Sequence, residues 1–97
     1  MISEKWNQMS KYQRFGNISS EICRSIQYLE LESMANYESS MYRVLDMIDY
    51  NKNVDKNIEL FRFYEHIAGL IFEPDLDELK SCFQYTMTLM NVPLIKN

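Results

Sequence analysis

Residues 57–72 read NIELFRFYEHIAGLIF, and this stretch carries apolar side chains around more of its circumference than any other part of the chain. At about 100° per residue, these side chains cover more than half of a helical wheel. They are Leu60, Phe61, Phe63, Tyr64, Ile67, Ala68, Leu70, Ile71 and Phe72. The pattern predicts the most buried helix of the fold, and we expect it to be the central one.

Length and composition indicate one helical domain that covers residues 1–97. The chain is 46% hydrophobic with only two glycines and two prolines, which excludes a disordered chain and disfavours a turn-rich β protein. Its net charge is −4, and its ten lysines and arginines are spread from Lys5 to Lys96 without a cluster. A nucleic-acid partner is therefore not expected.

Two amphipathic patterns precede the central stretch. Ser10 and Gln13 form a capping box that starts the first pattern. The second follows a break near residues 30–33, takes Ser33 as its cap and is expected to end around Tyr50, before a polar turn NKNVD. Their apolar faces are Phe15, Ile18, Ile22, Ile26 and Leu29 in the first pattern, and Met34, Tyr37, Met41, Val44, Leu45 and Ile48 in the second. Residues 1–9, with Trp6 and Met9, are expected to form a short helical turn folded back onto the body.

Proline residues delimit the last helix. Asp55 is expected to cap the central helix, which should end just before Pro74 because a residue that precedes proline disfavours α geometry. Asp75 and Glu78 form a second capping box, and Pro93 ends the helix that follows. The apolar stripe of this helix is Leu76, Leu79, Cys82, Phe83, Thr86 and Met90. Four helices joined by short turns predict an up-down-up-down four-helix bundle with a short N-terminal extension.

The polar strip of residues 57–72 contains the sharpest catalytic candidate. Glu59, Arg62 and His66 are spaced i, i+3 and i+7, which brings a cation and an imidazole to one side of the helix. In this interpretation Arg62 binds a phosphate, and His66 acts as general acid or base. Arg62 and His66 resemble the Arg-x4-6-His motif of the HEPN ribonuclease superfamily, although only three residues separate them here. The alternative interpretation is an exposed strip of ordinary side-chain pairs.

A second polar stripe lies on the back of the helix that follows Ser10. It consists of Asn17, Glu21, Arg24 and Tyr28. Glu21 and Arg24 are candidates for a functional pair, but such a stripe is more often a solvated face with one surface ion pair. We therefore expect a solvated face.

Residues 6–26, WNQMSKYQRFGNISSEICRSI, resemble the start of a family of small prokaryotic helical proteins. That family has Trp, then Met-Ser, then Asn-Ile-x-Ser-Glu-Val/Ile-x-Arg at similar spacing, and Gly16 stands where it usually has a larger helix former. The resemblance covers about the first quarter of the chain and extends more loosely through MYRVLDMIDY. It implies an all-helical fold and no particular activity.

The remaining features indicate a cytoplasmic protein without metal or cofactor. Cys23 and Cys82 lie far apart on or beside apolar faces, so free thiols are expected, and no Cys or His spacing suggests a metal site. The first residues contain no apolar signal core, and no apolar run approaches the roughly 20 residues that span a bilayer.

The wide apolar arc of residues 57–72 predicts self-association. A bundle helix normally offers its core a stripe somewhat over 100° wide, and this arc is roughly twice as wide. We expect a homodimer with Phe63, Ile67 and Leu70 in the interface. In the alternative, Trp6 and Met9 of the same chain lie across the arc.

Two functions follow from these features. Since no other catalytic constellation is present, we expect a protein that is not an enzyme and acts as a protein-interaction or regulatory module in a homo-oligomer. The alternative is a metal-independent ribonuclease of the HEPN type that uses Arg62 and His66.

Overall fold

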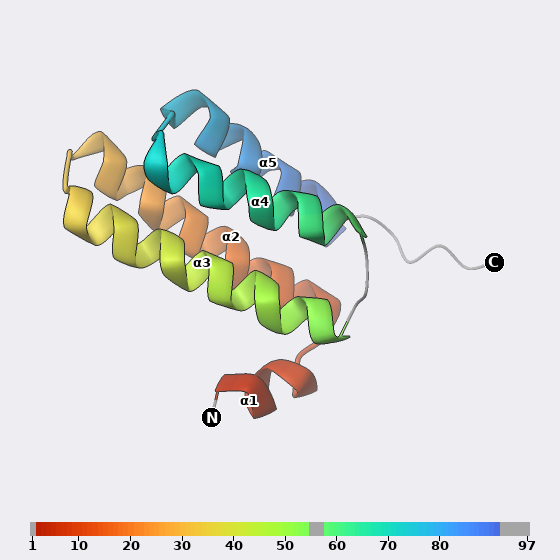
Figure 1. Cartoon of the computed structure of the whole chain (residues 1–97). Coiled ribbons are helices and arrows are strands. Elements are labelled where there is room, and N and C mark those ends of the chain that lie inside the picture. The colour runs from red at the N-terminus through yellow and green to blue at the C-terminus, as the bar shows by residue number, and fades with distance from the viewer. Residues whose placement is uncertain (1, 55–57, 92–97) are drawn as a thin grey trace.

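Figure 1 shows the computed structural model, which describes residues 2–54 and 58–91 of the chain and the side chains of residues 5–51 and 59–89. Every element within these ranges is an α-helix. The helices are α1 (Ile2–Gln8), α2 (Lys11–Glu30), α3 (Met34–Val54), α4 (Ile58–Phe72) and α5 (Leu76–Asn91). The predicted all-helical fold is confirmed.

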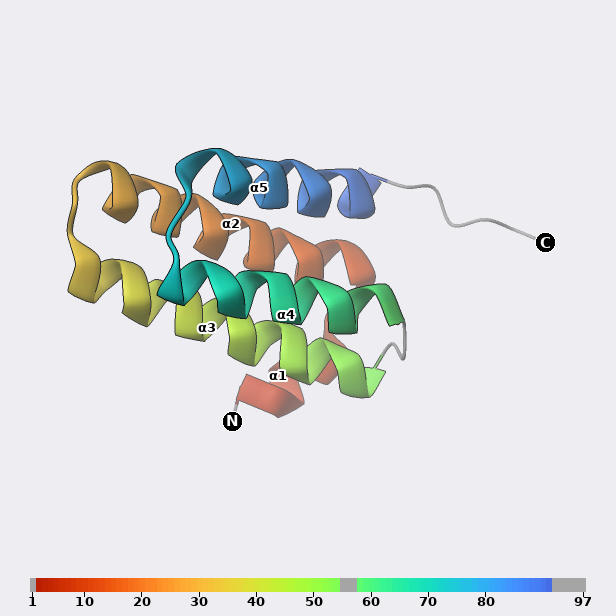
Figure 2. The same ribbon diagram turned by 45° about the horizontal axis from the view of Figure 1, so that its top comes forward.

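The four long helices run alternately in opposite directions (Figure 1 and Figure 2). α2 packs against both α3 and α5, and α3 packs against α4. In contrast, α4 and α5 meet over only a few residues, and the short helix α1 packs against α3. The turn between α2 and α3 and the turn between α4 and α5 therefore lie at the same end of the molecule.

The central position belongs to α2, so the prediction that residues 57–72 form the central helix is wrong. α2 lies between α3 and α5 and packs extensively against both, whereas α4 packs against α3 and scarcely meets α5. The helical-wheel prediction of burial is wrong because it considers apolar side chains only. α2 also buries polar side chains, which find hydrogen-bond partners on α3 and α5.

Capping interactions occur at the starts of α2 and α5, the two positions where the sequence predicts capping boxes. The Gln13 N–H donates to Ser10 Oγ at 3.1 Å, and the Ser10 N–H donates to Gln13 Oε1 at 2.9 Å, which completes the capping box of α2. At the start of α5, the Glu78 N–H donates to Asp75 Oδ1 at 3.1 Å. The Glu78 carboxylate lies 3.3 Å from His66 Nε2 and so links α5 to α4.

The turn between α2 and α3 forms at the predicted place without glycine or proline. The N–H of Glu32 donates to the Leu29 carbonyl, and the N–H of Ser33 donates to the Tyr28 carbonyl, the pattern of a Schellman motif. Glu32 has a φ of 57°, the left-handed conformation that glycine usually supplies at this position. The residue type therefore gave no sign of the break, which had to be inferred from the change in apolar phase.

The polar turn predicted for NKNVD is wrong over the part that the structure describes, because α3 continues to Val54. Asn51 is fully buried, and its Oδ1 accepts a hydrogen bond from Arg14 Nε at 2.6 Å. Arg14 also donates from Nη1 to the Met9 carbonyl at 2.8 Å, which anchors the turn between α1 and α2. Because Asn51 and Arg14 are 37 positions apart, the sequence around Asn51 shows only polar residues that resemble a turn.

The end of α4 agrees with the prediction, since Phe72 is its last residue and Pro74 follows two positions later. The predicted cap Asp55 and the predicted helix end at Pro93 lie outside the described residues. So does the side chain of Met90, the last position of the apolar stripe of α5.

The core takes side chains from all five helices. Trp6 is 1% exposed, so the N-terminal segment folds back onto the body as predicted. Its helix packs against α3, and the alternative in which Trp6 and Met9 lie across residues 57–72 is not supported. Met34, predicted on an apolar face, is 41% exposed. The buried apolar side chains are Trp6, Phe15, Ile18, Ile22, Tyr37, Met41, Val44, Leu45, Ile48, Leu60, Phe63, Ile67, Leu70, Ile71, Leu79 and Cys82.

Candidate functional site

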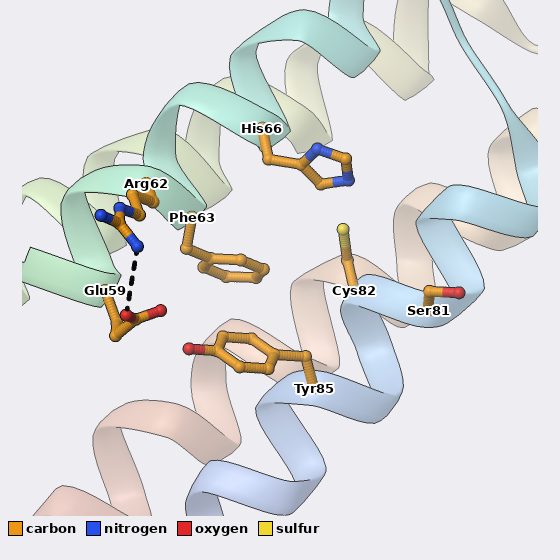
Figure 3. Close-up of a pocket in the computed structure, with 7 residues that line it drawn as sticks. All are labelled: Glu59, Arg62, Phe63, His66, Ser81, Cys82 and Tyr85. Atoms are coloured by element: carbon orange, nitrogen blue, oxygen red, sulfur yellow. Dashed lines mark ion pairs between the residues drawn. The ribbon is translucent and has the colours of Figure 1, made fainter.

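A groove between α4 and α5 brings the predicted polar strip of α4 together with residues 81–85 of α5 (Figure 3). Its volume is ≈ 240 Å³. The lining residues are Glu59, Arg62, Phe63 and His66 from α4 and Ser81, Cys82 and Tyr85 from α5. The groove is open to solvent because α4 and α5 pack closely against other helices and meet each other over few residues.

Apolar side chains form the floor of this groove. The rings of Phe63 and Tyr85 lie with their centroids 5.2 Å apart and are tilted by 48°, an arrangement that aromatic pairs favour. Figure 3 shows the thiol of Cys82 pointing into the groove toward the ring of His66. Phe63 and Cys82 are buried, whereas His66 and Arg62 are exposed, so the groove has an apolar floor and a polar rim.

The two basic side chains on the rim both face carboxylates. Arg62 Nη1 lies 3.6 Å from Glu59 Oε1, and His66 Nε2 lies 3.3 Å from Glu78 Oε2. These side chains are 48% to 70% exposed, so each pair contributes little to stability. The structure thus places Glu59, Arg62 and His66 in one groove, as the spacing predicts, but carboxylates compete with any phosphate for Arg62 and His66.

Burial favours the neutral forms of Cys82 and Tyr85, two side chains that α5 contributes to the groove. Desolvation, followed by the negative charge of Glu78, raises the pKa of the Cys82 thiol to about 12. Desolvation, followed by the charge of Glu59, also raises the pKa of Tyr85. Because Cys82 is a protonated thiol at neutral pH, the groove does not offer a thiolate nucleophile.

A second hollow continues from His66 toward the turn between α4 and α5, and its lining is acidic. Its volume is ≈ 410 Å³. Besides His66 it is lined by Glu65, Gly69, Leu70, Glu73, Asp75 and Glu78. The four carboxylates create a negative potential beside the apolar floor of the groove. A ligand that extends from the groove into this hollow is therefore expected to be cationic there.

The residues predicted for a dimer interface lie in the core of the single chain. Phe63, Ile67 and Leu70 are 6%, 0% and 6% exposed. The aromatic side chains that α4 does expose are Phe61 and Phe72, at 54% and 81%. The width of the arc indicated a surplus of apolar surface, but only the packing against α3 decides which part of the arc stays outside. Self-association itself stays a prediction.

The prediction of a solvated second stripe is wrong at Glu21, whereas Asn17 and Arg24 are exposed as expected. Glu21 is 4% exposed, and its carboxylate accepts from Ser40 Oγ at 2.6 Å, Arg24 Nη1 at 3.0 Å and Arg43 Nε at 3.1 Å. Ser25 Oγ donates to Ser40 Oγ at 2.8 Å. Glu21 and Arg24 do pair, but the carboxylate is closed off between α2 and α3, where it holds the two helices together.

The sequence interpretation missed the α5 half of the groove. Cys82 was assigned to an apolar stripe, and Ser81 and Tyr85 carried no signal that placed them opposite His66. The contact is a consequence of the turn at residues 73–75, which returns α5 along α4.

Within the described residues, no three side chains of His, Cys, Asp or Glu come together as metal ligands. None of the described helices is long and apolar enough to cross a membrane.

The chain matches no protein-family model, no curated protein and no solved structure. The resemblances to the HEPN ribonucleases and to a prokaryotic helical family therefore stay predictions from the sequence.

Proposed function

We propose that this protein is a protein-interaction module that binds an amphipathic segment of a partner protein in the groove between α4 and α5. The segment inserts one large apolar side chain into the groove and places a lysine or arginine in the acidic hollow. The observation that carries the proposal is the apolar floor of Phe63, Cys82 and Tyr85, which opens directly beside four carboxylates.

The size of the apolar groove suits one large side chain. The groove measures ≈ 240 Å³, below the roughly 300–1,000 Å³ of small-molecule and cofactor sites, and the adjoining hollow of ≈ 410 Å³ has an acidic lining that suits the polar part of the ligand. Amphipathic helices commonly bind by laying apolar side chains into grooves between helices. One anchoring side chain fits this volume, and the polar rim of Glu59, Arg62 and His66 surrounds it.

The charges beside the groove select the polar part of the ligand. Glu65, Glu73, Asp75 and Glu78 line the hollow that continues from His66. The chain as a whole has a net charge of −4. A basic side chain next to the apolar anchor is attracted by this field, and an acidic one is repelled.

The groove belongs to a helical bundle that we propose to be cytoplasmic. The four long helices act as an up-down-up-down four-helix bundle with α1 as an extension, which the packing of α2 against α3 and α5 supports. The protein works in the cytoplasm, which the free thiols of Cys23 and Cys82 support.

A pair of synthetic peptides tests the proposal. One is a fluorescent amphipathic helix of leucine and lysine, and the other is a matched helix of leucine and glutamate. We expect the lysine peptide to bind, and the glutamate peptide to bind at least about tenfold more weakly. Ser81→Trp, which fills the groove from an exposed position, should weaken binding of the lysine peptide by a similar factor.

Matched controls separate the groove from general attraction to an acidic protein. Glu73→Gln with Glu78→Gln removes charge at the hollow, and Glu38→Gln with Asp46→Asn removes the same charge from exposed positions of α3. Only the first pair should weaken binding strongly. Equal effects of both pairs, or no effect of Ser81→Trp, would show that the peptide does not use the groove.

The ribonuclease alternative is tested on the same protein with mixed RNA. We expect no cleavage, because Arg62 and His66 each face a carboxylate and the adjacent hollow repels phosphate. Cleavage by the wild-type chain that is lost in both Arg62→Ala and His66→Ala would establish an enzyme in place of the interaction module.

A further inference from the structure

α4 carries a row of exposed side chains that the groove does not use. Phe61 and Phe72 are 54% and 81% exposed, Ala68 is partly exposed and Glu65 is exposed. At about 100° per residue, these four positions fall within about 60° of one another on the helix. The basic side chains Arg62 and His66, which line the groove, lie about 60° to 160° away around α4. Phe61, Glu65, Ala68 and Phe72, the outer row, therefore face away from the groove and share only Glu65 with the acidic hollow.

The outer row has the same spacing in both directions along the helix. Its members are separated by four, three and four positions. When two copies of α4 lie antiparallel about a twofold axis, Phe61 comes opposite Phe72 of the second copy, and Glu65 comes opposite Ala68. A parallel pair would instead place Glu65 against the same residue of the second copy, where like charges repel. The spacing therefore fits a twofold antiparallel pair.

We propose that the outer row of α4 docks against the outer row of a second copy of this chain to form a twofold homodimer with antiparallel α4 helices. The two phenylalanines of each copy form the ends of the contact. The short side chain of Ala68 lets the helix axes approach at the centre, where the aliphatic stem of Glu65 covers it and leaves the carboxylate in water. The groove between α4 and α5 stays open in this dimer because it lies on the other flank.

The exposed area indicates a weak, reversible dimer. A phenylalanine side chain presents about 150–250 Å², so the exposed fractions of Phe61 and Phe72 leave roughly 270 Å² of aromatic surface on each copy. Stable interfaces bury about 1,200–2,000 Å² in total. The four phenylalanines supply under half of that area, and neighbouring side chains of α4 must supply the rest. We expect a dissociation constant in the micromolar range.

Sedimentation equilibrium of the full chain tests the dimer. Phe61→Glu and Phe72→Glu should each raise the dissociation constant by about tenfold or more, because each places a charge against an aromatic ring of the second copy. Leu31→Glu is the matched control, since Leu31 is 76% exposed but lies in the turn between α2 and α3. It should change the constant by less than about twofold.

A charge exchange tests the antiparallel arrangement. Phe61→Lys and Phe72→Glu proteins should each be mostly monomeric alone and should form a mixed dimer when combined. In the mixed dimer one contact joins Lys to Glu and the other keeps both phenylalanines. A parallel pair would not bring these positions together, so it would not be rescued by mixing.

Three results would overturn the proposal. They are a wild-type chain that stays monomeric at about a hundred micromolar, a dimer that Leu31→Glu weakens as much as Phe72→Glu does, and a dimer that only Ser81→Trp disrupts. The last result would place the second copy in the groove. Because Phe72 is next to Glu73 of the hollow, the uncharged variant Phe72→Ser separates the two proposals. It should weaken the dimer and bind the lysine peptide as the wild type does, so this proposal and the proposed function fail separately.

Discussion

The helix pair α2–α3 and the helix pair α4–α5 differ in how they use charge. α2 and α3 pack along most of their length and enclose the carboxylate of Glu21 with Ser40 and two arginines. α4 and α5 meet over few residues, and the exposed pair His66 and Glu78 is a polar link between them. A buried charge with several partners fixes which helices pair, whereas an exposed pair leaves the surface free to bind something else.

The largest effect is expected when the enclosed carboxylate is removed. Glu21→Ala removes the carboxylate that accepts from Ser40 Oγ and from two arginines and opens a cavity between α2 and α3, so we expect a loss of about 2–4 kcal/mol in the free energy of unfolding. Urea denaturation measures it. Glu38→Ala, at an exposed position of α3, is the control and should change stability by less than about 0.5 kcal/mol. Equal losses of stability in the two variants would show that the buried carboxylate of Glu21 stabilises the fold no more than an exposed one.

The next effect concerns the buried thiol between α4 and α5 at alkaline pH. Folding raises the pKa of Cys82 from 9.0 to about 12, so the fold favours the protonated thiol. This contribution is complete below pH 9 and is lost as the pH rises from 9 toward 12. Urea denaturation across this range should show a steeper loss of stability for the wild type than for Cys82→Ala. Tyr37, whose pKa is raised from 10.0 to about 12 by burial and then by the charge of Cys82, is present in both proteins. Its contribution from burial, the larger cause, cancels in the difference, and the remainder belongs to the effect of Cys82. Parallel profiles would show that burial does not hold the thiol neutral.

A smaller effect is expected at the contact between α2 and α5. Ser19 Oγ donates to Thr86 Oγ1 at 2.6 Å, and both residues are buried. Thr86→Val keeps the shape but leaves the Ser19 hydroxyl unsatisfied, so we expect a loss of about 1–2 kcal/mol. The double variant Ser19→Ala with Thr86→Val should recover part of this loss. A double variant that is less stable than the single one would contradict a role for this hydrogen bond.

The smallest effect is a gain on the open side of α4. A Cβ added at Gly69 meets nothing within 4 Å. Gly69→Ala should therefore stabilise the protein by about 0.5–1 kcal/mol through its helix propensity alone. Thermal unfolding measures the gain. A loss of stability would mean that another part of the chain covers this face of α4.

The sequence by itself determined the local structure of this protein. The hydroxyl of Ser10 and the amide of Gln13 are three positions apart, so the start of α2 depends on residues that the sequence shows side by side. The end of α4 before Pro74 and the apolar faces of α2, α3 and α5 follow from the same short-range rules of helix geometry. These features needed no knowledge of the tertiary structure.

Only the tertiary structure decided which helix is central, how far α3 extends and what the groove contains. Glu21 finds Ser40 on another helix, and Asn51 finds Arg14 at 37 positions away, so both residues appear in the sequence as ordinary surface positions. Cys82 points toward His66 across the groove only because α5 returns along α4. A polar side chain can be buried when a partner meets it there, and the identity of that partner depends on packing between helices that no local pattern records.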